Sequence, residues 1–384
     1  MNTIPGVRDM LEALIAEVSI SSASAEWDHS NAGVIHLLAG WLEGLGFAVE
    51  LMPVARAPGK FNLLATLGQG PGGLVLSGHT DTVPFDKDRW TSDPFRLSER
   101  EGRWYGLGTC DMKGFFPLVI EAARAYVGQA FQHPLIILAT ADEESSMFGA
   151  KALVEAGRPK ARCAVIGEPT GLRPIRMHKG ILMERLVLEG LSGHSSDPAL
   201  GRNALEGMHA AMGELLALRQ EWQGHWQNPG FRVAVPTLNL GHIHGGDNPN
   251  RICPACELHF DVRPLPGMSL EQIRAEIGER VSRVAERYGL NMVFEPLFDG
   301  VPPFETPADA ELVKVCERLT GHTAESVAFA TEAPFLQALG METLVLGPGS
   351  IDQAHQPDEY LALDQIDPTL RLLRGLIEHY CLAR

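Results

Sequence analysis

Several strand-like runs of this 384-residue sequence end in acidic or imidazole side chains. Three of these clusters are Gly78-His79-Thr80-Asp81, Asp142-Glu143-Glu144 and Gly167-Glu168-Pro169. His355 follows a fourth strand in a loop that Gly347-Pro348-Gly349-Ser350 opens, and Asp111 lies in a glycine-flanked turn (108–114) before a predicted helix. Two imidazoles with several carboxylates, and no need for a thiolate, suit zinc held by nitrogen and oxygen. The sequence therefore predicts a metal centre with open positions for water and substrate.

The expected sheet explains why these clusters would meet. A single His or Glu after a strand is most often a solvated loop residue. In doubly wound sheets, however, reactive groups collect beyond the carboxyl ends of the strands. The joint occurrence of the clusters at strand ends therefore favours one common site.

Other motifs in the sequence give weaker or no support to alternative chemistry. Residues 68–73 match the letters G-x-G-x-x-G, but a strand follows them instead of a helix, so we predict a turn and no phosphate site. Cys253 and Cys256 form a C-x-x-C that could be half of a zinc site, but no second pair follows at a suitable distance, which favours a structural role. The sequence has neither an H-E-x-x-H helix motif nor a G-x-S-x-G nucleophile elbow.

The elements that position the clusters alternate between strands and helices up to about residue 175. Strands are expected at 74–77, 135–141 and 163–167, and helices at 33–45 and 114–126. The same character resumes near the end of the chain, with helices at 309–319 and 368–381 and a strand at 343–346. We predict an α/β fold whose phosphorylase/hydrolase-like catalytic domain is built around a mostly parallel central sheet. This domain is discontinuous and comprises residues 1–176 and 297–384.

The middle of the sequence follows another pattern. Strands are expected at 182–189, 237–243, 257–262 and 292–295, with helices at 203–220 and 270–288. That β-α-β-β-α-β order is the ferredoxin-like motif. We predict an inserted ferredoxin-like α+β domain over 177–296.

Composition and charge limit the classes of partner. A formal net charge of −16 argues against nucleic acid and anionic membrane surfaces, which reward basic patches. No run approaches the ~20 apolar residues of a membrane span. The N-terminus lacks the pattern of a secretory signal, so we expect a cytoplasmic protein.

On these residues the sequence resembles the metal-dependent aminoacylase and carboxypeptidase family, nearly from end to end. The family-wide stretches are 77–84, 105–115, 140–144 and 167–170. Narrower features resemble the members that act on N-acetylornithine, and these lie at 192–198, 250–253, 261–268, 331–335 and 347–359.

This resemblance implies a role for each site residue. His79 and Glu168 would bind one metal ion, Glu144 and His355 the other, and Asp111 would bridge both. Asp81 would hydrogen-bond the imidazole of the metal-binding histidine and fix its tautomer. The metal would be zinc, two ions per subunit, with cobalt able to replace it. The resemblance also implies a cis peptide bond after Asp111.

The resemblance further implies the proton-transfer and carbonyl-binding groups. Glu143 would be the general base, although spacing alone does not distinguish it from Glu144. His194 would reach the scissile carbonyl from the partner subunit of a homodimer formed through the inserted domain, and would donate to the oxyanion. The alternative for His194 is a solvent-exposed turn residue.

The implied reaction is hydrolysis of the amide of N2-acetyl-L-ornithine to L-ornithine and acetate, a step of arginine biosynthesis. For the substrate carboxylate, candidates are Arg263, Arg251 and Lys179, with Asn250 as a polar neighbour, although each charge could equally be a solvated one at a strand edge. Glu332, next to Thr331, is the candidate for the ornithine ammonium. Rival readings are a succinyl-diaminopimelate desuccinylase, a broader N-acyl-amino-acid deacylase, a small-peptide aminopeptidase and a non-catalytic amino-acid-binding relative. The last reading predicts a lost ligand or base, and none is missing here.

Overall fold

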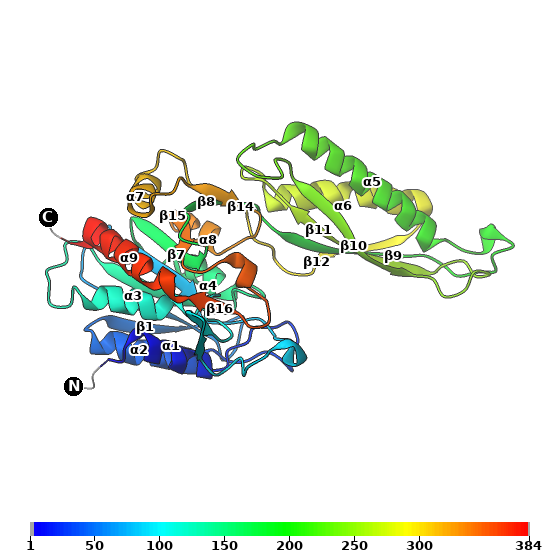
Figure 1. Cartoon of the computed structure of the whole chain (residues 1–384). Coiled ribbons are helices and arrows are strands. Elements are labelled where there is room, and N and C mark those ends of the chain that lie inside the picture. Colours follow the sequence, from blue (N-terminus) through cyan, green and yellow to red (C-terminus); the bar gives the residue numbers. More distant parts are fainter. Residues whose placement is uncertain (1–3, 383–384) are drawn as a thin grey trace. The chain divides into compact units, whose positions relative to one another are not determined.

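The structure is a computed structural model that describes residues 4–382 (Figure 1). Its contacts divide the chain into two compact units, of which the first comprises 4–176, 306–325 and 331–382 and the second 177–305 and 326–330. The predicted catalytic domain also included residues 1–3 and 383–384, which lie outside the described residues. Within 4–382, no helix is long and apolar enough to cross a membrane.

The first unit is built around a sheet whose four central strands are parallel. In spatial order they are β6 (Leu135–Thr140), β3 (Leu74–His79), β7 (Cys163–Pro169) and β15 (Glu342–Gly347). On one side the sheet continues antiparallel with β2 (Phe61–Leu67) and β1 (Ala48–Pro53), and on the other side β8 (Ile175–His178) pairs antiparallel with β15 through Ile175. β8 runs across the boundary at Arg176, and its second-unit residues Met177 and His178 pair with β13 (Phe304–Glu305) of the same unit, while β14 (Glu325–Val327) also pairs with β8. The predicted α/β fold with a mostly parallel central sheet is confirmed.

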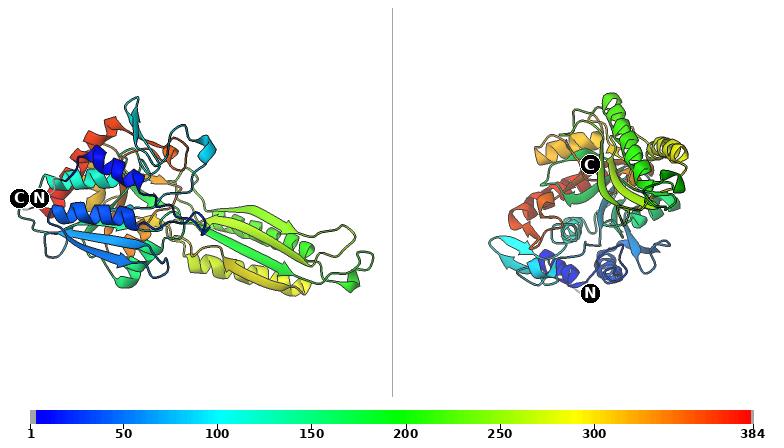
Figure 2. Two further views of the ribbon diagram at one scale, coloured as in Figure 1. Left: turned by 90° about the horizontal axis from the view of Figure 1, so that it is seen from below. Right: turned by 90° about the vertical axis from the view of Figure 1, so that its right-hand side faces the viewer.

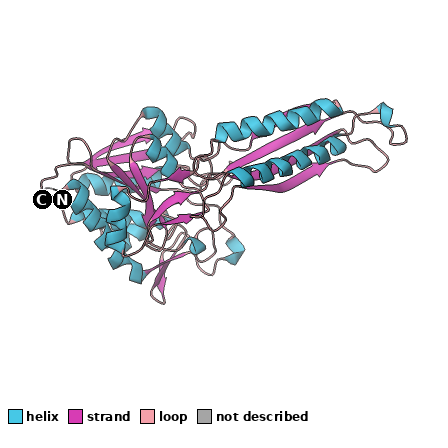
Figure 3. Cartoon of the chain, turned by 90° about the horizontal axis from the view of Figure 1, so that it is seen from above, coloured by secondary structure: helices cyan, strands magenta, loops and turns pink. Residues whose placement is uncertain are grey.

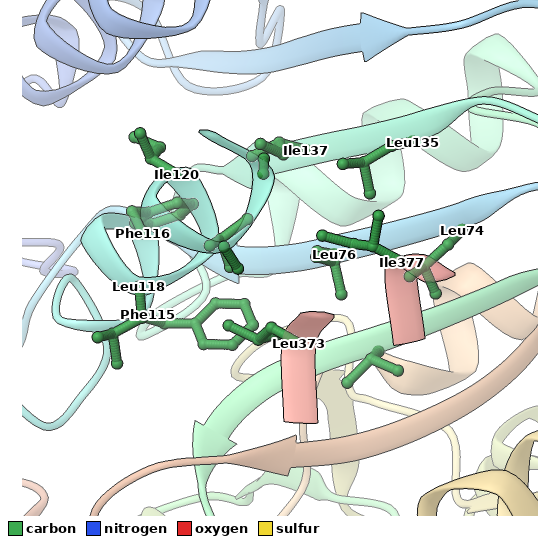
Figure 4. Packing of buried hydrophobic residues seen from close by; sticks show 14 of the residues in the cluster. Leu74, Leu76, Phe115, Phe116, Leu118, Ile120, Leu135, Ile137, Leu373 and Ile377 are labelled. Carbon is green, nitrogen blue, oxygen red and sulfur yellow. The ribbon is translucent and has the colours of Figure 1, made fainter. Parts of the chain in front are cut away.

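Helices cover this sheet because its central strands are apolar on both faces. Leu74 and Leu76 of β3 pack against α3 (Phe115–Arg124) and α9 (Ile366–Cys381), as Figure 4 shows for Phe115, Leu373 and Ile377. Val75, between the two leucines, is equally buried and points to the opposite face. The other helices of this unit are α1 (Val7–Ala16), α2 (Ala32–Gly44), α4 (Phe148–Ala156), α7 (Glu311–Thr320) and α8 (Ala333–Ala338). The left view of Figure 2 shows α2 running along β1 and β2.

A small second sheet brings two distant segments of the first unit together. It consists of β4 (Ser98–Arg100), β5 (Arg103–Tyr105) and β16 (Tyr360–Ala362), all antiparallel. Because Tyr360 pairs with Tyr105, the segment after His355 lies beside the segment that leads to Asp111.

The second unit contains a four-stranded antiparallel sheet with two helices on one face (Figure 3). In chain order its elements are β9 (Leu182–Glu189), α5 (Ala204–His225), β10 (Thr237–Gly245), β11 (Ala255–Arg263), α6 (Leu270–Tyr288) and β12 (Asn291–Pro296). The spatial order is β10-β11-β9-β12, and β11 alternates buried and half-buried residues over most of its length, as a sheet with one covered face requires. The predicted β-α-β-β-α-β order is therefore observed.

The second unit extends further along the chain than the predicted limit of 296. The chain passes from the first unit to the second after Arg176, where the sequence placed the boundary. It first returns to the first unit at Thr306. The physical reason is main-chain pairing inside the second unit, because Leu297 N–H donates to Met183 and Val301 exchanges hydrogen bonds with Ile181. Residues 297–305 therefore belong with the insertion.

Candidate metal centre

The carboxyl ends of the parallel strands carry the predicted ligands in the first unit. His79 is the last residue of β3, and Glu168 lies near the end of β7. Glu144 follows β6, and His355 follows β15 after a short connecting loop. Asp111 comes from the loop between β5 and α3, which the small second sheet supports. The local fold thus delivers each side chain to one edge of the sheet.

One group of potential ligands is formed by His79, Asp111 and Glu168, whose ligand atoms all lie within 4.8 Å of one another. The Nε2 atom of His79 is 3.0 Å from Oδ1 of Asp111 and 3.9 Å from Oε1 of Glu168. All three residues are buried, so the group is shielded from solvent.

A second group shares Asp111 with the first and adds Glu144 and His355. Nε2 of His355 is 3.0 Å from Oε2 of Glu144 and 3.6 Å from Oδ2 of Asp111. Asp111 thus turns one oxygen toward each histidine. This is the arrangement that a carboxylate bridging two cations requires.

The electrostatics of the two groups fit divalent cations. Burial lowers the pKa of His79, but the hydrogen bond with Asp111 and the charge of Glu168 outweigh burial and raise this pKa well above its ordinary value. Burial, followed by the charges of Asp111 and Glu144, raises the pKa of Glu168 well above its ordinary value. Crowded carboxylates therefore share protons that metal ions would displace, since ligands must be deprotonated to bind.

Asp81 contacts both groups, one through its main-chain carbonyl and the other through its carboxylate. The Nδ1–H of His79 donates to the main-chain carbonyl of Asp81 at 3.0 Å, whereas the carboxylate Oδ1 lies 3.9 Å from that nitrogen. The other carboxylate oxygen, Oδ2, accepts the main-chain N–H of Glu144 at 3.0 Å. The sequence analysis expected a hydrogen bond between Asp81 and the imidazole without specifying the atom of Asp81, and in the structure the main-chain carbonyl makes it. The carbonyl contact still selects the tautomer that leaves Nε2 facing Asp111.

Glu143 lies beside the ligands without belonging to either shared group. With His79 and Glu144 it forms a third group whose potential ligand atoms lie within 4.8 Å of one another. Burial raises its pKa well above the ordinary value, and the charges of Glu168 and Glu144 add to the shift. A carboxylate that gains a proton readily beside a potential metal centre is suited to proton transfer.

The structure adds Lys60, a buried cation that the sequence analysis did not single out. Its Nζ atom lies 2.5 Å from Oδ1 of Asp142 and 2.6 Å from Oδ1 of Asp28. Asp142 immediately precedes Glu143 and has a positive φ of 66°. Lys60 therefore fixes the start of the turn that carries both glutamates. A lysine between two strands, far from Asp142 along the chain, gives no local pattern that would have revealed this role.

His194 and the predicted carboxylate-binding residues lie in the second unit. His194 is exposed, and its Nδ1 is 2.7 Å from Oγ of Ser196. Arg251, which pairs with His194 in a short β-bridge, forms an ion pair with Asp247, and the main-chain carbonyl of Asn250 accepts from Ser195 N–H at 3.1 Å.

Lys179 and Arg263 differ from these exposed groups. Lys179 is buried, its Nζ donates to the Val235 carbonyl at 2.6 Å, and burial followed by the charge of Arg263 lowers its pKa. Arg263 is half-buried and pairs with Asp261 at 3.0 Å. Two neighbouring cations, one of them buried, are suited to an anionic group.

Thr331 and Glu332 lie in the first unit and are buried, each 1% exposed. Oε2 of Glu332 accepts from the Thr140 hydroxyl at 2.7 Å, whereas Oε1 has no hydrogen-bond partner within residues 4–382. Burial raises the pKa of Glu332 to about 7. Glu332 therefore has an unsatisfied acceptor close to the metal centre, since its charge also acts on Glu143 and Glu168.

Comparison with known proteins gives matches over nearly the whole chain. The model of Peptidase family M20/M25/M40 matches residues 75–379. Proteins named acetylornithine deacetylase from Edwardsiella ictaluri (strain 93-146) and Proteus mirabilis (strain HI4320) are 53% and 51% identical to this chain, covering 99% of it and 100% and 98% of their own lengths. The crystal structure of an M20 family metallo-carboxypeptidase from Sulfolobus solfataricus has a TM-score of 0.76 at 16% identity, with 97% of this chain and 99% of that chain covered.

Proposed function

Since this chain belongs to peptidase family M20/M25/M40, we propose that it hydrolyses the amide of N2-acetyl-L-ornithine to L-ornithine and acetate at a centre of two zinc ions. The observation that carries the two-ion centre is the position of Asp111, whose two oxygens face different histidines. The substrate rests on the identity to the two acetylornithine deacetylases over nearly full length. The product places the reaction in arginine biosynthesis.

The ligand set supports zinc with a nitrogen and two carboxylates for each ion, and His79-Asp111-Glu168 and Asp111-Glu144-His355 would hold the two. Cobalt is proposed to replace zinc, because it accepts the same nitrogen and oxygen ligands. When bound, the ions polarise the amide carbonyl and make water more acidic.

Glu143 would transfer the protons of the reaction. It takes a proton from the attacking water as the new C–O bond forms, and it returns that proton to the nitrogen as the C–N bond breaks. The acetyl group leaves as acetate and ornithine leaves as the amine. This carboxylate can do both because its pKa stands well above the ordinary value.

His194 would donate a hydrogen bond to the developing oxyanion from the second subunit of a homodimer. The supporting observation is that the imidazole is exposed and that Ser196 holds its Nδ1, which leaves Nε2 to face another group. A donor aimed at the oxyanion is worth about 10²- to 10³-fold in kcat. The test is to mix two inactive variants, His194→Ala and Glu143→Gln. Recovered activity in the mixed dimer supports a His194 contributed in trans, and a mixture that stays inactive contradicts it.

The substrate would be held at both of its charged ends. Arg263 and Lys179 would bind the α-carboxylate, with Asn250 and Arg251 beside them, since a paired cationic site suits a carboxylate. Oε1 of Glu332 would accept a hydrogen bond from the ornithine ammonium, and Thr331 would lie beside this contact. A buried acceptor without a partner is costly until a donor reaches it, which supports this assignment.

A substrate panel tests the proposed specificity. The zinc-loaded chain is expected to cleave N2-acetyl-L-ornithine with a higher kcat/KM than N-acetylmethionine, N-succinyl-diaminopimelate or a dipeptide. Glu332→Gln is expected to raise the KM for acetylornithine much more than that for acetylmethionine. Equal increases for both substrates would remove Glu332 from substrate recognition, and a preference for the succinyl compound would replace the proposed substrate.

A further inference from the structure

Glu359 is a buried acidic residue at the entrance to β16, four residues after His355. Only 1% of its surface is exposed. Its carboxylate points into the loop that carries Asp111, and all of the residues involved belong to the first unit. None of the roles proposed above uses this carboxylate.

Three main-chain N–H groups of the Asp111 loop donate to this one carboxylate. Gly108 N–H donates to Oε2 at 3.0 Å, and Cys110 and Asp111 N–H donate to Oε1 at 2.7 and 2.9 Å. Both oxygens of the carboxyl group thus accept from the loop. The carboxylate therefore fixes the backbone on which the bridging side chain is mounted.

The main chain of Glu359 holds the same loop from a second direction. Its carbonyl accepts Gly106 N–H at 3.1 Å, and the next residue, Tyr360, pairs with Tyr105 in the small sheet. The carboxylate and its backbone are thus both anchored on the segment from 105 to 111. Since His355 lies on the same short loop as Glu359, its chain path is tied to that of Asp111.

We propose that Glu359 is a positioning residue of the metal centre, which holds Asp111 and the His355 loop in place so that both shared groups are preformed before an ion binds. The inference rests on the proposed metal centre and not on the identity of the acyl amino acid. Glu359 touches no substrate in this assignment. It acts through Asp111.

The chemistry of the contact selects the variants. Glu359→Gln keeps the size of the side chain, but its NH₂ group must face at least one main-chain N–H. Two donors then face each other, and that hydrogen bond is lost. Glu359→Asp keeps the carboxyl group and withdraws it by one methylene. Asp358→Asn is the matched control, because Asp358 is the adjacent acid on the same loop, yet its carboxylate accepts from Thr91 at 3.0 and 2.8 Å and not from the Asp111 loop.

The experiment measures zinc binding to the metal-free full-length chain by competition with a chromophoric chelator. Glu359→Gln is expected to raise the Kd of at least one ion about 10- to 100-fold, the usual effect of losing a group that orients a ligand. Glu359→Asp should show a smaller increase, and Asp358→Asn should stay within about twofold of the parent. The visible absorption spectrum of the cobalt-loaded centre should shift in Glu359→Gln, and excess zinc should restore part of its kcat with little change in KM.

Thermal melts of the metal-free variants separate positioning from folding. Should Glu359→Gln fail to fold, Glu359→Asp decides the question by the same titration. Folded variants that bind both ions with the parent's Kd and give an unchanged cobalt spectrum would overturn the proposal. If the parent chain itself binds no pair of ions, the metal centre under "Proposed function" fails instead, so the two failures are distinct.

Discussion

The carboxylate of Asp81 accepts the main-chain N–H of Glu144 at 3.0 Å. The same residue accepts from His79 through its carbonyl oxygen, so one residue orients ligands of both proposed ions. This relationship makes the acceptor oxygen, more than the negative charge, the important property of the Asp81 side chain. It also predicts how two substitutions at this position should differ.

Asp81→Ala is expected to lower zinc affinity about 10- to 100-fold, because Glu144 N–H loses its acceptor. Asp81→Asn should lose less, since its amide oxygen can still accept from that N–H. The chelator competition assay measures both Kd values. An asparagine variant as impaired as the alanine variant would show that the charge of Asp81 matters more than its hydrogen bond to Glu144.

The adjacent residues Glu143 and Glu144 should separate into base and ligand. Glu143→Gln is expected to lower kcat by about 10²- to 10⁴-fold, the range for loss of a general base, while zinc stoichiometry stays at the parent value. Glu144→Gln is expected to lose one of the two ions. The zinc content of the purified variants is measured by metal analysis, and kcat is measured on the same preparations. Loss of an ion from Glu143→Gln would reverse the assignment.

Lys60 should matter for stability more than an exposed lysine does. Lys60→Gln removes the cation from two carboxylates, of which Asp142 is buried, and breaking a buried pair this way costs about 3 to 5 kcal/mol. Lys160→Gln, at an exposed position, is the control and should change the free energy of unfolding by less than about 0.5 kcal/mol. Denaturant unfolding compares the two. Equal, small changes would mean that Lys60 does not hold the turn before Glu143.

His178 should make the stability of the second unit depend on pH. Burial lowers its pKa from the ordinary 6.5 to about 4, and its ring packs on Phe304. The unfolded chain therefore binds a proton between these pH values that the folded chain does not, so this contribution is present above pH 6.5 and is lost as the pH falls toward 4. The full loss is about 3 kcal/mol.

Substitution isolates this effect from the other titrating groups. His178→Gln should have a flatter dependence of unfolding free energy on pH between 6.5 and 4 than the parent chain, measured by denaturant unfolding at several pH values. Parallel curves for the two proteins would show that His178 titrates alike in the folded and unfolded states.

Some residues of the site could be predicted from the sequence, and others depend on the folded backbone. His79, Glu144, Glu168 and His355 could be found from the sequence because each lies at or after the carboxyl end of an apolar strand, and parallel strands bring these ends to one edge. Their grouping around Asp111 came from the family resemblance. Which atoms of Asp81 reach His79 and Glu144 could not be predicted, because the direction of a side chain in a turn depends on backbone angles that residue types do not specify.

Lys60 and Glu359 were not found because their partners are distant in the sequence. Lys60 forms its ion pair with Asp142, which is far away along the chain. Glu359 reaches the loop at 108–111 only because β16 pairs with β5. The same reason explains the second boundary of the insertion. Residues 297–305 look like a linker by composition, but their main-chain hydrogen bonds to the segment at 181–183 assign them to the second unit.

Metal reconstitution tests the central claim most directly. The metal-free full-length chain is titrated with zinc, and acetate release from N2-acetyl-L-ornithine is measured at each addition, with cobalt in a parallel series. We predict that activity is absent without metal, rises with added zinc, and reaches its plateau at two ions per chain. Absence of metal-dependent acetate release from N2-acetyl-L-ornithine and from every other N-acetyl amino acid tried would contradict the account.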